Sequence, residues 1–289
     1  MSEHTFSFQV GNFRCTSITD GVSKRDFESV ADRFPAIPRQ EFLGSLRKAY
    51  PSQQPLNWSM NCLFIETDDQ NVLVDTGIGP REEGQSGNLI GLLEEFVDLP
   101  KVDAVIITHC HGDHIGGLVN AEGELAFPNA EYFMLAEEWE HWMGQEGVVT
   151  RAEEGYAQLL RSKLQPIRQR LTLIRAEEEF IAGIRAVAAP GHTPGHIGLL
   201  IESRGETLLD LSDTLHTRVQ FLHPEWSPRF DTDPEVAAQT RAEMLSFAAD
   251  EGHLTLFYHL ALPGLGTIRR DGDIFQWQPW EGESRTALS

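Results

Sequence analysis

Short apolar runs separated by polar turns dominate the first half of the chain. The runs at 61–67 (NCLFIET) and 71–77 (NVLVDTG) predict two paired strands, because the three polar residues between them suit a turn. A helical pattern follows at about 88–97 and closes before Pro100, and the run at 102–109 (VDAVIITH) predicts a further strand. This half therefore reads as a β-rich unit that contains a short helix.

The second half repeats this pattern of apolar runs. Both 183–203 (GIRAVAAPGHTPGHIGLLIES) and 206–216 (ETLLDLSDTLH) consist of short apolar stretches that end in His or Asp. Helices are expected near 136–143 and 151–165. A further helix is expected from Asp233–Pro234, where Asp can cap and Pro suits the first turn, to about residue 250.

Strands and helices are thus interleaved, but they do not follow a strict parallel βαβ order. An α/β fold with a mixed two-sheet core and outer helices is predicted over a single domain, 1–289. Residues 1–58 are harder to place, because 34–55 holds four of the fifteen prolines and shows no clear period. That stretch is expected to be either an arm that packs on a partner subunit or a long surface loop.

The charge balance narrows the function classes. Lys and Arg number 23 against 44 Asp and Glu, which gives a formal charge of −21. Such a field repels phosphate backbones and anionic lipid, so neither nucleic acid nor a membrane is expected as a partner. No apolar stretch approaches the length of about 18 residues that a span needs, and the N-terminus does not resemble a signal peptide. Three widely spaced cysteines predict no disulfide framework, so a cytoplasmic location is expected.

The strongest chemical signal is the run His109-Cys110-His111-Gly112-Asp113-His114, directly after the predicted strand at 102–109. In extended backbone, alternate side chains share a face, so His109 and His111 can converge on one ion while Cys110 points away into the packing. Gly112 permits a turn, after which Asp113 and His114 face inward from another direction. The run therefore suits two neighbouring ions better than one.

Further ligands are available at other strand ends. His192 lies in the turn PGHTPGH, His259 ends TLFYH, and Asp213 follows ETLLDLS. Asp213 is preferred to Asp210 because it lies at the end of the strand, and its carboxylate has two oxygens with which to bridge two ions. Imidazole and carboxylate ligands predict two divalent metal ions, with zinc favoured and manganese, iron or cobalt as alternatives.

These motifs, together with VDTG at 74–77, resemble the metallo-β-lactamase superfamily over roughly residues 60–265. The resemblance implies an αββα sandwich with the metals at one edge. It also implies that one ion is held by His109, His111 and His192, the other by Asp113, His114 and His259, that Asp213 bridges them, and that Asp75 supports the site from behind. His196 and His216, beside the motifs, are expected to hydrogen-bond ligands.

Within the superfamily, the C-terminal half looks similar to methyl parathion hydrolase and related lactonases, which are commonly dimeric. The run 217–245 and the following HLALPGLGTIRRDGDIFQWQP carry this weaker likeness. It implies a homodimeric hydrolase in which a hydroxide between the ions opens a lactone or cleaves a related ester, and the expected substrates are neutral molecules with an apolar tail. Asp113 is a candidate to carry a proton to the leaving group. The aromatic residues Phe221, Trp226 and Phe230 are candidates for a substrate-pocket wall.

Alternatives remain on the same scaffold. A phosphotriester hydrolase of the methyl parathion hydrolase type needs the same site and a different substrate. A persulfide dioxygenase would use a single iron with two His and one Asp, whereas a metal-binding protein without turnover would lack ligands. A secreted β-lactamase is disfavoured because the N-terminus does not resemble a leader, and glyoxalase II is disfavoured because no GCGR run follows. The negative charge disfavours a ribonuclease.

Overall fold

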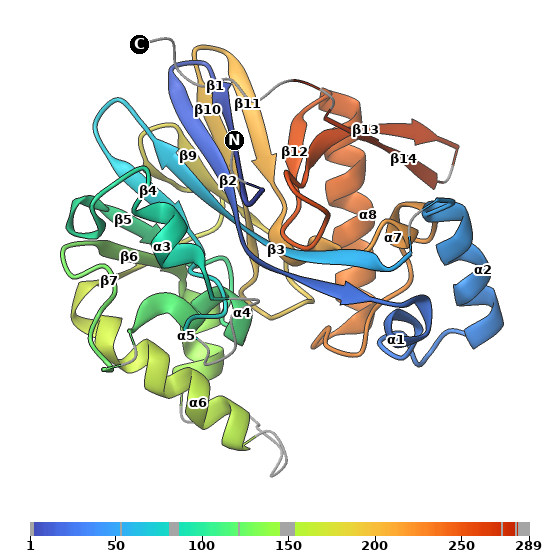
Figure 1. Cartoon of the computed structure of the whole chain (residues 1–289), viewed down its shortest axis with the longest axis horizontal. Helices are drawn as coiled ribbons and strands as arrows, with labels where there is room; N and C mark the ends of the chain where they lie inside the picture. The colour runs from blue at the N-terminus through green and yellow to red at the C-terminus, as the bar shows by residue number, and fades with distance from the viewer. Residues whose placement is uncertain are drawn as a thin grey trace.

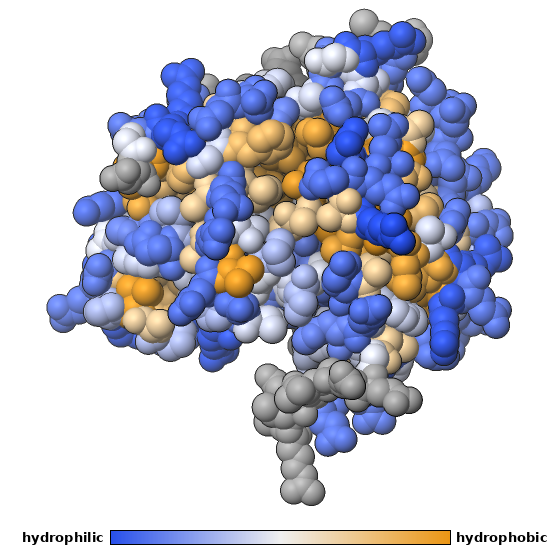
Figure 2. Space-filling view, turned by 180° about the vertical axis from the view of Figure 1, so that it is seen from behind, coloured by the Kyte–Doolittle hydropathy of each residue, from blue (hydrophilic) through white to orange (hydrophobic). Residues whose placement is uncertain are grey.

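The computed structural model describes residues 3–52, 54–80, 87–120, 122–144, 154–272, 274–280 and 282. Two mixed sheets face each other, and helices cover their outer faces (Figure 1). Among these residues, no helix is both long enough and apolar enough to cross a bilayer. Polar and charged side chains cover most of the face in Figure 2, where they surround smaller apolar patches.

The first sheet contains seven described strands in chain order. Its first four strands are antiparallel, and its last four, counted from β4, run parallel to one another. The strands are β1 Thr5–Val10, β2 Phe13–Arg25, β3 Leu56–Glu66, β4 Asn71–Val74, β5 Ala104–Ile106, β6 Glu131–Leu135 and β7 Leu171–Ile174.

The second sheet also contains seven described strands, ordered from β14 to β8. Only the β11–β12 pair is parallel, since α8 connects these two strands; the other pairs are antiparallel. The strands are β8 Glu179–Ile181, β9 Ile184–Ala188, β10 Ile197–Ser203, β11 Glu206–Asp210, β12 Leu254–Leu256, β13 Leu265–Asp271 and β14 Ile274–Pro279.

Helices flank both sheets. The first sheet is accompanied by α3 Leu89–Leu93, α4 Gly112–Ile115, α5 Ala136–Met143, α6 Glu154–Leu164 and the 3₁₀ turns Leu99–Lys101, Gly116–Leu118 and Gln165–Arg170. The second sheet is accompanied by α7 Val219–Leu222, α8 Pro234–Glu251 and the 3₁₀ turn Ser212–Thr214. The helices α1 Phe27–Ala31 and α2 Arg39–Ala49 pack at one end, beside α7.

The alternation of side chains along β3 shows how the layers are held together. Leu63 and Ile65 lie in the apolar core between the two sheets, whereas Cys62 and Phe64 face the core under the helices of the first sheet. All four side chains are buried. Burying a large apolar side chain contributes about 1.5–3 kcal/mol, so both faces stabilise the sandwich. The predicted α/β fold of αββα type is confirmed.

The prediction of an arm or a loop within residues 1–58 is wrong for most of that stretch. β1 and β2 are strands of the first sheet, and residues 39–49 form α2. Phe34 and Phe42 stack with ring centroids 4.5 Å apart, and Trp226 packs on Phe42. The apolar side chains of α1 and α2 therefore belong to a core cluster within this chain, which the prolines obscured.

Two predicted helices differ in their bounds. The helix expected over 88–97 is limited to α3, Leu89–Leu93, and the residues after it continue as hydrogen-bonded turns up to Val97. The helix expected over 151–165 is described from Glu154, since 151–153 lie outside the described residues. By contrast, α8 starts as predicted: the Asp233 side chain accepts a bond from Val236 N, and Pro234 occupies the first turn.

Candidate metal centre

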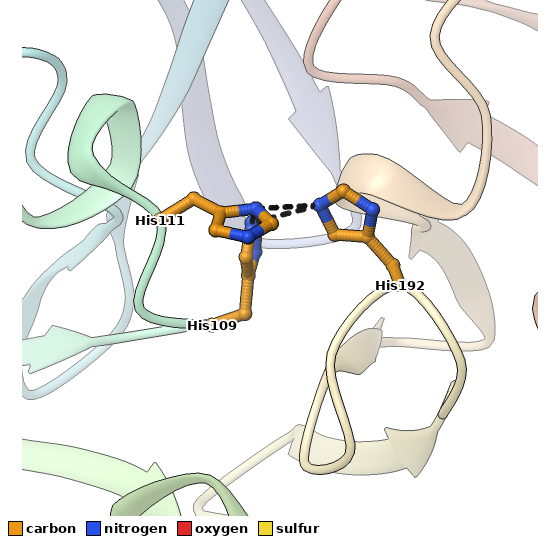
Figure 3. A group of neighbouring side chains, drawn as sticks. All are labelled: His109, His111 and His192. Carbon is orange, nitrogen blue, oxygen red and sulfur yellow. Dashed lines mark hydrogen bonds between the residues drawn. The ribbon is translucent and has the colours of Figure 1, made fainter. Parts of the chain in front are cut away.

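Three imidazoles converge where β5 ends. His109 and His111 follow β5, and His192 comes from the loop after β9; their rings point toward one another (Figure 3). His109 Nε2 lies 3.1 Å from His111 Nδ1, which lies 2.9 Å from His192 Nε2, and 3.2 Å separates the remaining pair. Strands of both sheets thus supply one cluster of nitrogen atoms.

The spacing of these nitrogens is compatible with a shared metal ion. His192 Nδ1 is 2.8 Å from Asp231 Oδ1 and donates there, which leaves Nε2 as the ring nitrogen that faces the cluster. A tetrahedral zinc ion with bonds of about 2.0–2.1 Å to nitrogen separates its ligands by about 3.3 Å. The observed separations of 2.9–3.2 Å are close to that value.

A second group lies beside the first. The short helix α4 begins after His111, and its first turn carries Asp113 and His114. His259, from the loop after β12, has its Nε2 3.6 Å from Asp113 Oδ2. The potential ligand atoms of Asp113, His114 and His259 all lie within 4.8 Å of one another. The structure therefore brings together the residues expected to hold the second ion.

Asp213 lies between the two groups. Its Oδ2 is 3.3 Å from His192 Nε2 in the first group, and 3.4 Å and 3.2 Å from the Nε2 atoms of His114 and His259 in the second. Its other oxygen, Oδ1, is buried and has no hydrogen-bond partner among the described residues. A buried carboxylate oxygen without a partner is costly, and a cation on either side satisfies it. The donor set therefore fits two divalent ions with Asp213 shared.

Asp75 supports this arrangement from behind, at the end of β4. Its Oδ2 accepts a hydrogen bond from His114 Nδ1 at 2.7 Å and another from Thr108 Oγ1 at 2.7 Å, while its Oδ1 accepts from Thr108 N at 2.9 Å. The contact fixes the ring of His114 so that Nε2 faces Asp213. Asp75 adopts a φ of 58°, a conformation that a non-glycine residue keeps only when its surroundings hold it.

The pKa values of the clustered histidines shift in opposite directions. Burial, and then repulsion between neighbouring imidazoles, holds the pKa of His109 and of His111 well below its usual value. Both rings are neutral and offer lone pairs. Burial also lowers the pKa of His114, but the carboxylates of Asp213 and Asp75 outweigh it and raise that pKa well above its usual value. A cation beside Asp213 would replace the proton on His114.

Two further histidines contact Asp213, which lies in the 3₁₀ turn Ser212–Thr214 after β11. Asp213 N donates to His196 Nε2 at 3.3 Å, and the other nitrogen of that ring bonds Ala189 O at 2.8 Å. Burial lowers the pKa of His196 to about 3 and that of His216 to about 4. His216 Nε2 lies 3.2 Å from Asp213 Oδ2, and its ring lines the pocket. Both expected neighbours of the ligands thus contact Asp213.

Asp231 and Arg241 support His192, and the sequence analysis missed both. Asp231 accepts from His192 Nδ1 through one oxygen and lies 3.1 Å from Arg241 Nη2 through the other. Arg241 is 1% exposed and also donates to Thr214 O at 2.7 Å. An arginine in α8 therefore connects the loop of His192 with that of Asp213. Asp231 directly follows Phe230. The sequence FDTDP alone does not distinguish Asp231 from Asp233, which caps α8.

Glu138 is a second missed residue. It is fully buried in α5, yet it accepts from Cys110 N, Gly195 N and Thr193 Oγ1. It therefore holds the loop of His109 and His111 against the loop of His192. Cys110 is buried with its Sγ 3.7 Å from Met134 Sδ, so it packs away from the ligands as predicted.

A pocket of about 700 Å³ opens over the ligand groups, a size typical of small-molecule sites. Its walls include Trp58, Met60 and Phe230. Two of the three aromatic residues predicted for the wall are misplaced: Phe221 stacks on Trp277, and Trp226 packs on His223 and Phe42. Both are buried in core clusters because the turn at α7 directs them inward, and sequence composition does not distinguish a core aromatic from a pocket aromatic.

Residues 58–265 match the family model of the metallo-beta-lactamase superfamily. The chain belongs to this superfamily. The match runs from β3 to β12 and includes all of the candidate ligands described above. The resemblance seen in the sequence motifs is thereby confirmed.

Similar proteins within the superfamily are hydrolases. The N-acyl homoserine lactonase of Bacillus thuringiensis is 25% identical over 237 residues, 74% of this chain and 86% of the relative. AidC, a dizinc quorum-quenching lactonase solved with a product, N-hexanoyl-L-homoserine, superposes with a TM-score of 0.87 at 25% identity over 96% of this chain and 98% of AidC. The hydrolase AbOPH of the beta lactamase superfamily superposes with a TM-score of 0.88 at 25% identity over 98% and 99%.

The predicted enzyme class is confirmed at the level of a metal-dependent hydrolase. The superfamily match gives the fold, the relatives are hydrolases, and the His and Asp groups described above fit two divalent ions.

Proposed function

We propose that this protein is a dizinc lactonase that opens the ring of an N-acyl homoserine lactone or a related lactone. The observation that carries the proposal is the position of Asp213, whose Oδ2 lies between both ligand groups on the floor of a pocket of small-molecule size. The lactonase relatives support the lactone as substrate, and the predominance of imidazole ligands supports zinc.

When bound, two divalent ions lower the pKa of water and polarise the carbonyl oxygen of a substrate. The chain supplies the geometry for this chemistry. Asp213 and Asp75 orient the ligand rings, and His196 fixes the backbone of Asp213. Asp113 is the carboxylate of the second group that reaches the pocket, with a side chain that is 30% exposed. We infer that it passes a proton to the alkoxide that leaves when the ring opens.

The second ligand group favours this reading over a mononuclear iron dioxygenase. His111, His259 and Asp213 approach from three separate segments, and every residue of the predicted set either belongs to one of the two groups or lies between them. A phosphotriester would bind at the same metal ligands as a lactone. Measured turnover of both compounds is therefore needed to decide which one is the preferred substrate.

The test is metal content of the purified protein, combined with turnover of N-hexanoyl-homoserine lactone, an aryl ester, a dialkyl aryl phosphate and glutathione persulfide. We expect two zinc ions per chain and the highest kcat/KM on the lactone. Asp113→Ala should reduce the metal content toward one ion per chain and lower kcat/KM by more than about 100-fold, because it removes a ligand and the proton carrier together.

Asp69→Ala, in the exposed turn before β4, is the matched control and should retain wild-type metal and activity. A single iron per chain with oxygen uptake on the persulfide would overturn the proposal. So would two metals and full activity in Asp113→Ala.

A further inference from the structure

Three cations line the pocket above the metal ligands. Arg25 ends β2, Arg33 follows α1, and Lys163 lies near the end of α6 across the opening. The acids that line the pocket are Asp113 and Asp213, which belong to the metal groups; every other described lining residue is neutral or cationic. In a chain with 44 acidic and 23 basic side chains, this local excess of positive charge is unexpected.

These cations have no carboxylate partner among the described residues. The described ion pairs of lysine and arginine are formed instead by Arg14, Arg39, Lys101, Arg185, Arg241 and Arg270. Arg25 Nε is buried and lacks a hydrogen-bond acceptor among the described residues. A buried guanidinium donor without an acceptor is unfavourable, so the site is better satisfied when an anion is present.

Arg33 is held in place for such a contact. Its guanidinium carbon lies 5.4 Å from the centre of the Trp58 ring, and its Nη1 donates to Ser29 O at 3.2 Å. Burial, and then the nearby cations Arg25 and Arg229, lower the pKa of Arg33. Arg25 and Arg33 thus repel each other at the rim of the pocket, which these two residues form together with Lys163 and Trp58. An anion between the two guanidinium groups would relieve that repulsion.

The distance between the candidate metal ligand His259 and the Arg33 guanidinium fits a substrate with a short acyl chain. The ring of Trp58 has its centre 5.3 Å from that of the ligand His259. The Arg33 guanidinium carbon and the His259 ring are therefore separated by no more than this distance and the 5.4 Å contact added together. A short acyl chain can span that gap, with its reactive carbonyl on the floor and its far end at the arginines.

We propose that the pocket selects lactones or esters whose acyl chain ends in an anionic group, which Arg25 and Arg33 bind and Lys163 attracts from the opposite wall. The substrate class rests on the lactonase function proposed above; the anion contact does not. The net negative charge of the chain repels anions at long range, but screening over about 8 Å at physiological salt leaves the local cations dominant at the rim.

The test compares two lactones that differ only at the chain end: N-hexanoyl- and N-adipoyl-homoserine lactone, the second ending in a carboxylate. The zinc-loaded enzyme should show at least about tenfold higher kcat/KM on the adipoyl compound, mainly through KM, as expected for a charge-assisted contact. The preference should fall as NaCl is raised. The methyl ester of the adipoyl compound, which has the same length without the charge, should behave like the hexanoyl lactone.

Arg33→Gln and Arg25→Gln should each reduce the preference about tenfold, because kcat/KM falls much more on the adipoyl lactone than on the hexanoyl lactone. Lys163→Gln, on the other wall, should reduce it less. Arg47→Gln, on the exposed side of α2, is the matched control and should keep the full preference. Thermal melts identify any variant that does not fold, and the remaining variants then decide the result.

Equal turnover of the two lactones by the wild type, or a preference that survives Arg25→Gln, Arg33→Gln and Lys163→Gln, overturns the inference. If neither lactone is opened, the proposed function fails, and calorimetry with monomethyl and dimethyl adipate still tests the rim. Tighter binding of the monomethyl ester by the wild type, lost in the arginine variants, supports the anion contact; equal binding rejects it.

Discussion

The floor of the pocket consists of His and Asp ligands that follow strand ends, whereas its rim consists of Arg25, Arg33, Lys163 and Trp58 from unrelated segments. Floor residues are fixed by buried partners: Asp75 holds His114, and Asp231 holds His192. Rim cations lack carboxylate partners among the described residues. The floor is therefore held rigidly by the protein itself, whereas the rim cations remain available to a ligand, as proposed above.

The largest effect on metal content and activity is expected at Asp213, on the floor of the pocket. Asp213→Asn keeps the shape but replaces one carboxylate oxygen by an amide that cannot bridge two cations. We expect loss of at least one metal per chain and a fall in kcat/KM of more than about 100-fold on every substrate, measured by elemental analysis and steady-state kinetics.

Asp210→Asn, three residues earlier, is the control for that change. Burial raises the pKa of Asp210 to about 7, and its Oδ1 accepts from Ser212 N, so an amide can replace it. If Asp210→Asn removed the metals and Asp213→Asn did not, the bridging assignment would be wrong.

An intermediate effect is expected at Asp231, which links the floor to the core. Asp231→Asn leaves the buried Arg241 without its charge partner, a change that costs about 3–5 kcal/mol in the free energy of unfolding of the metal-free protein. It also loosens His192, so metal affinity should fall about 10–100-fold. Chemical denaturation and metal titration measure the two effects.

The stability effect depends on pH. Burial opposes ionisation of Asp231, but His192 and Arg241 outweigh it and lower its pKa to about 2. Because the folded pKa lies below the unfolded value of about 3.9, the stabilisation is fully present above pH 4 and is lost as pH falls toward 2. The difference between wild type and variant should shrink over that range. Asp250→Asn, which breaks an exposed pair with Arg270, should cost at most about 1 kcal/mol.

The smallest effect is expected at Phe230, an uncharged wall residue. Its ring centre lies 4.6 Å from that of His216, at the side of the pocket. Phe230→Leu should change KM for acyl lactones by about tenfold or less, with kcat and metal content unchanged, since only apolar contact is altered. Phe247→Leu, on the exposed side of α8, should change neither. A large fall in kcat would show that Phe230 shapes the floor as well.

The prediction from sequence was most accurate where the chemistry demands residue types at short spacing. The run from His109 to His114 could be interpreted alone, because few other roles need such a density of ligands. Isolated residues such as His192 and His259 were identified by their place after strands, and the structure brings them to the same floor. The N-terminal stretch was misread because its apolar positions serve α1 and α2, which pack on a distant segment near Trp226.

The sequence by itself determined the two-sheet α/β layering and the superfamily, and it predicted the candidate metal-ligand set, because periodicity and ligand density are local properties of the chain. Only the tertiary structure decided which aromatic residues reach the pocket, which buried acids hold the ligand loops, and which cations meet at the rim. Lys163 lies more than a hundred residues from Arg25 and Arg33 in the sequence, and the three have no shared motif. Their proximity arises from the packing of β2, α1 and α6 around one opening, and side chains that interact only through such packing leave no periodic signal in the sequence.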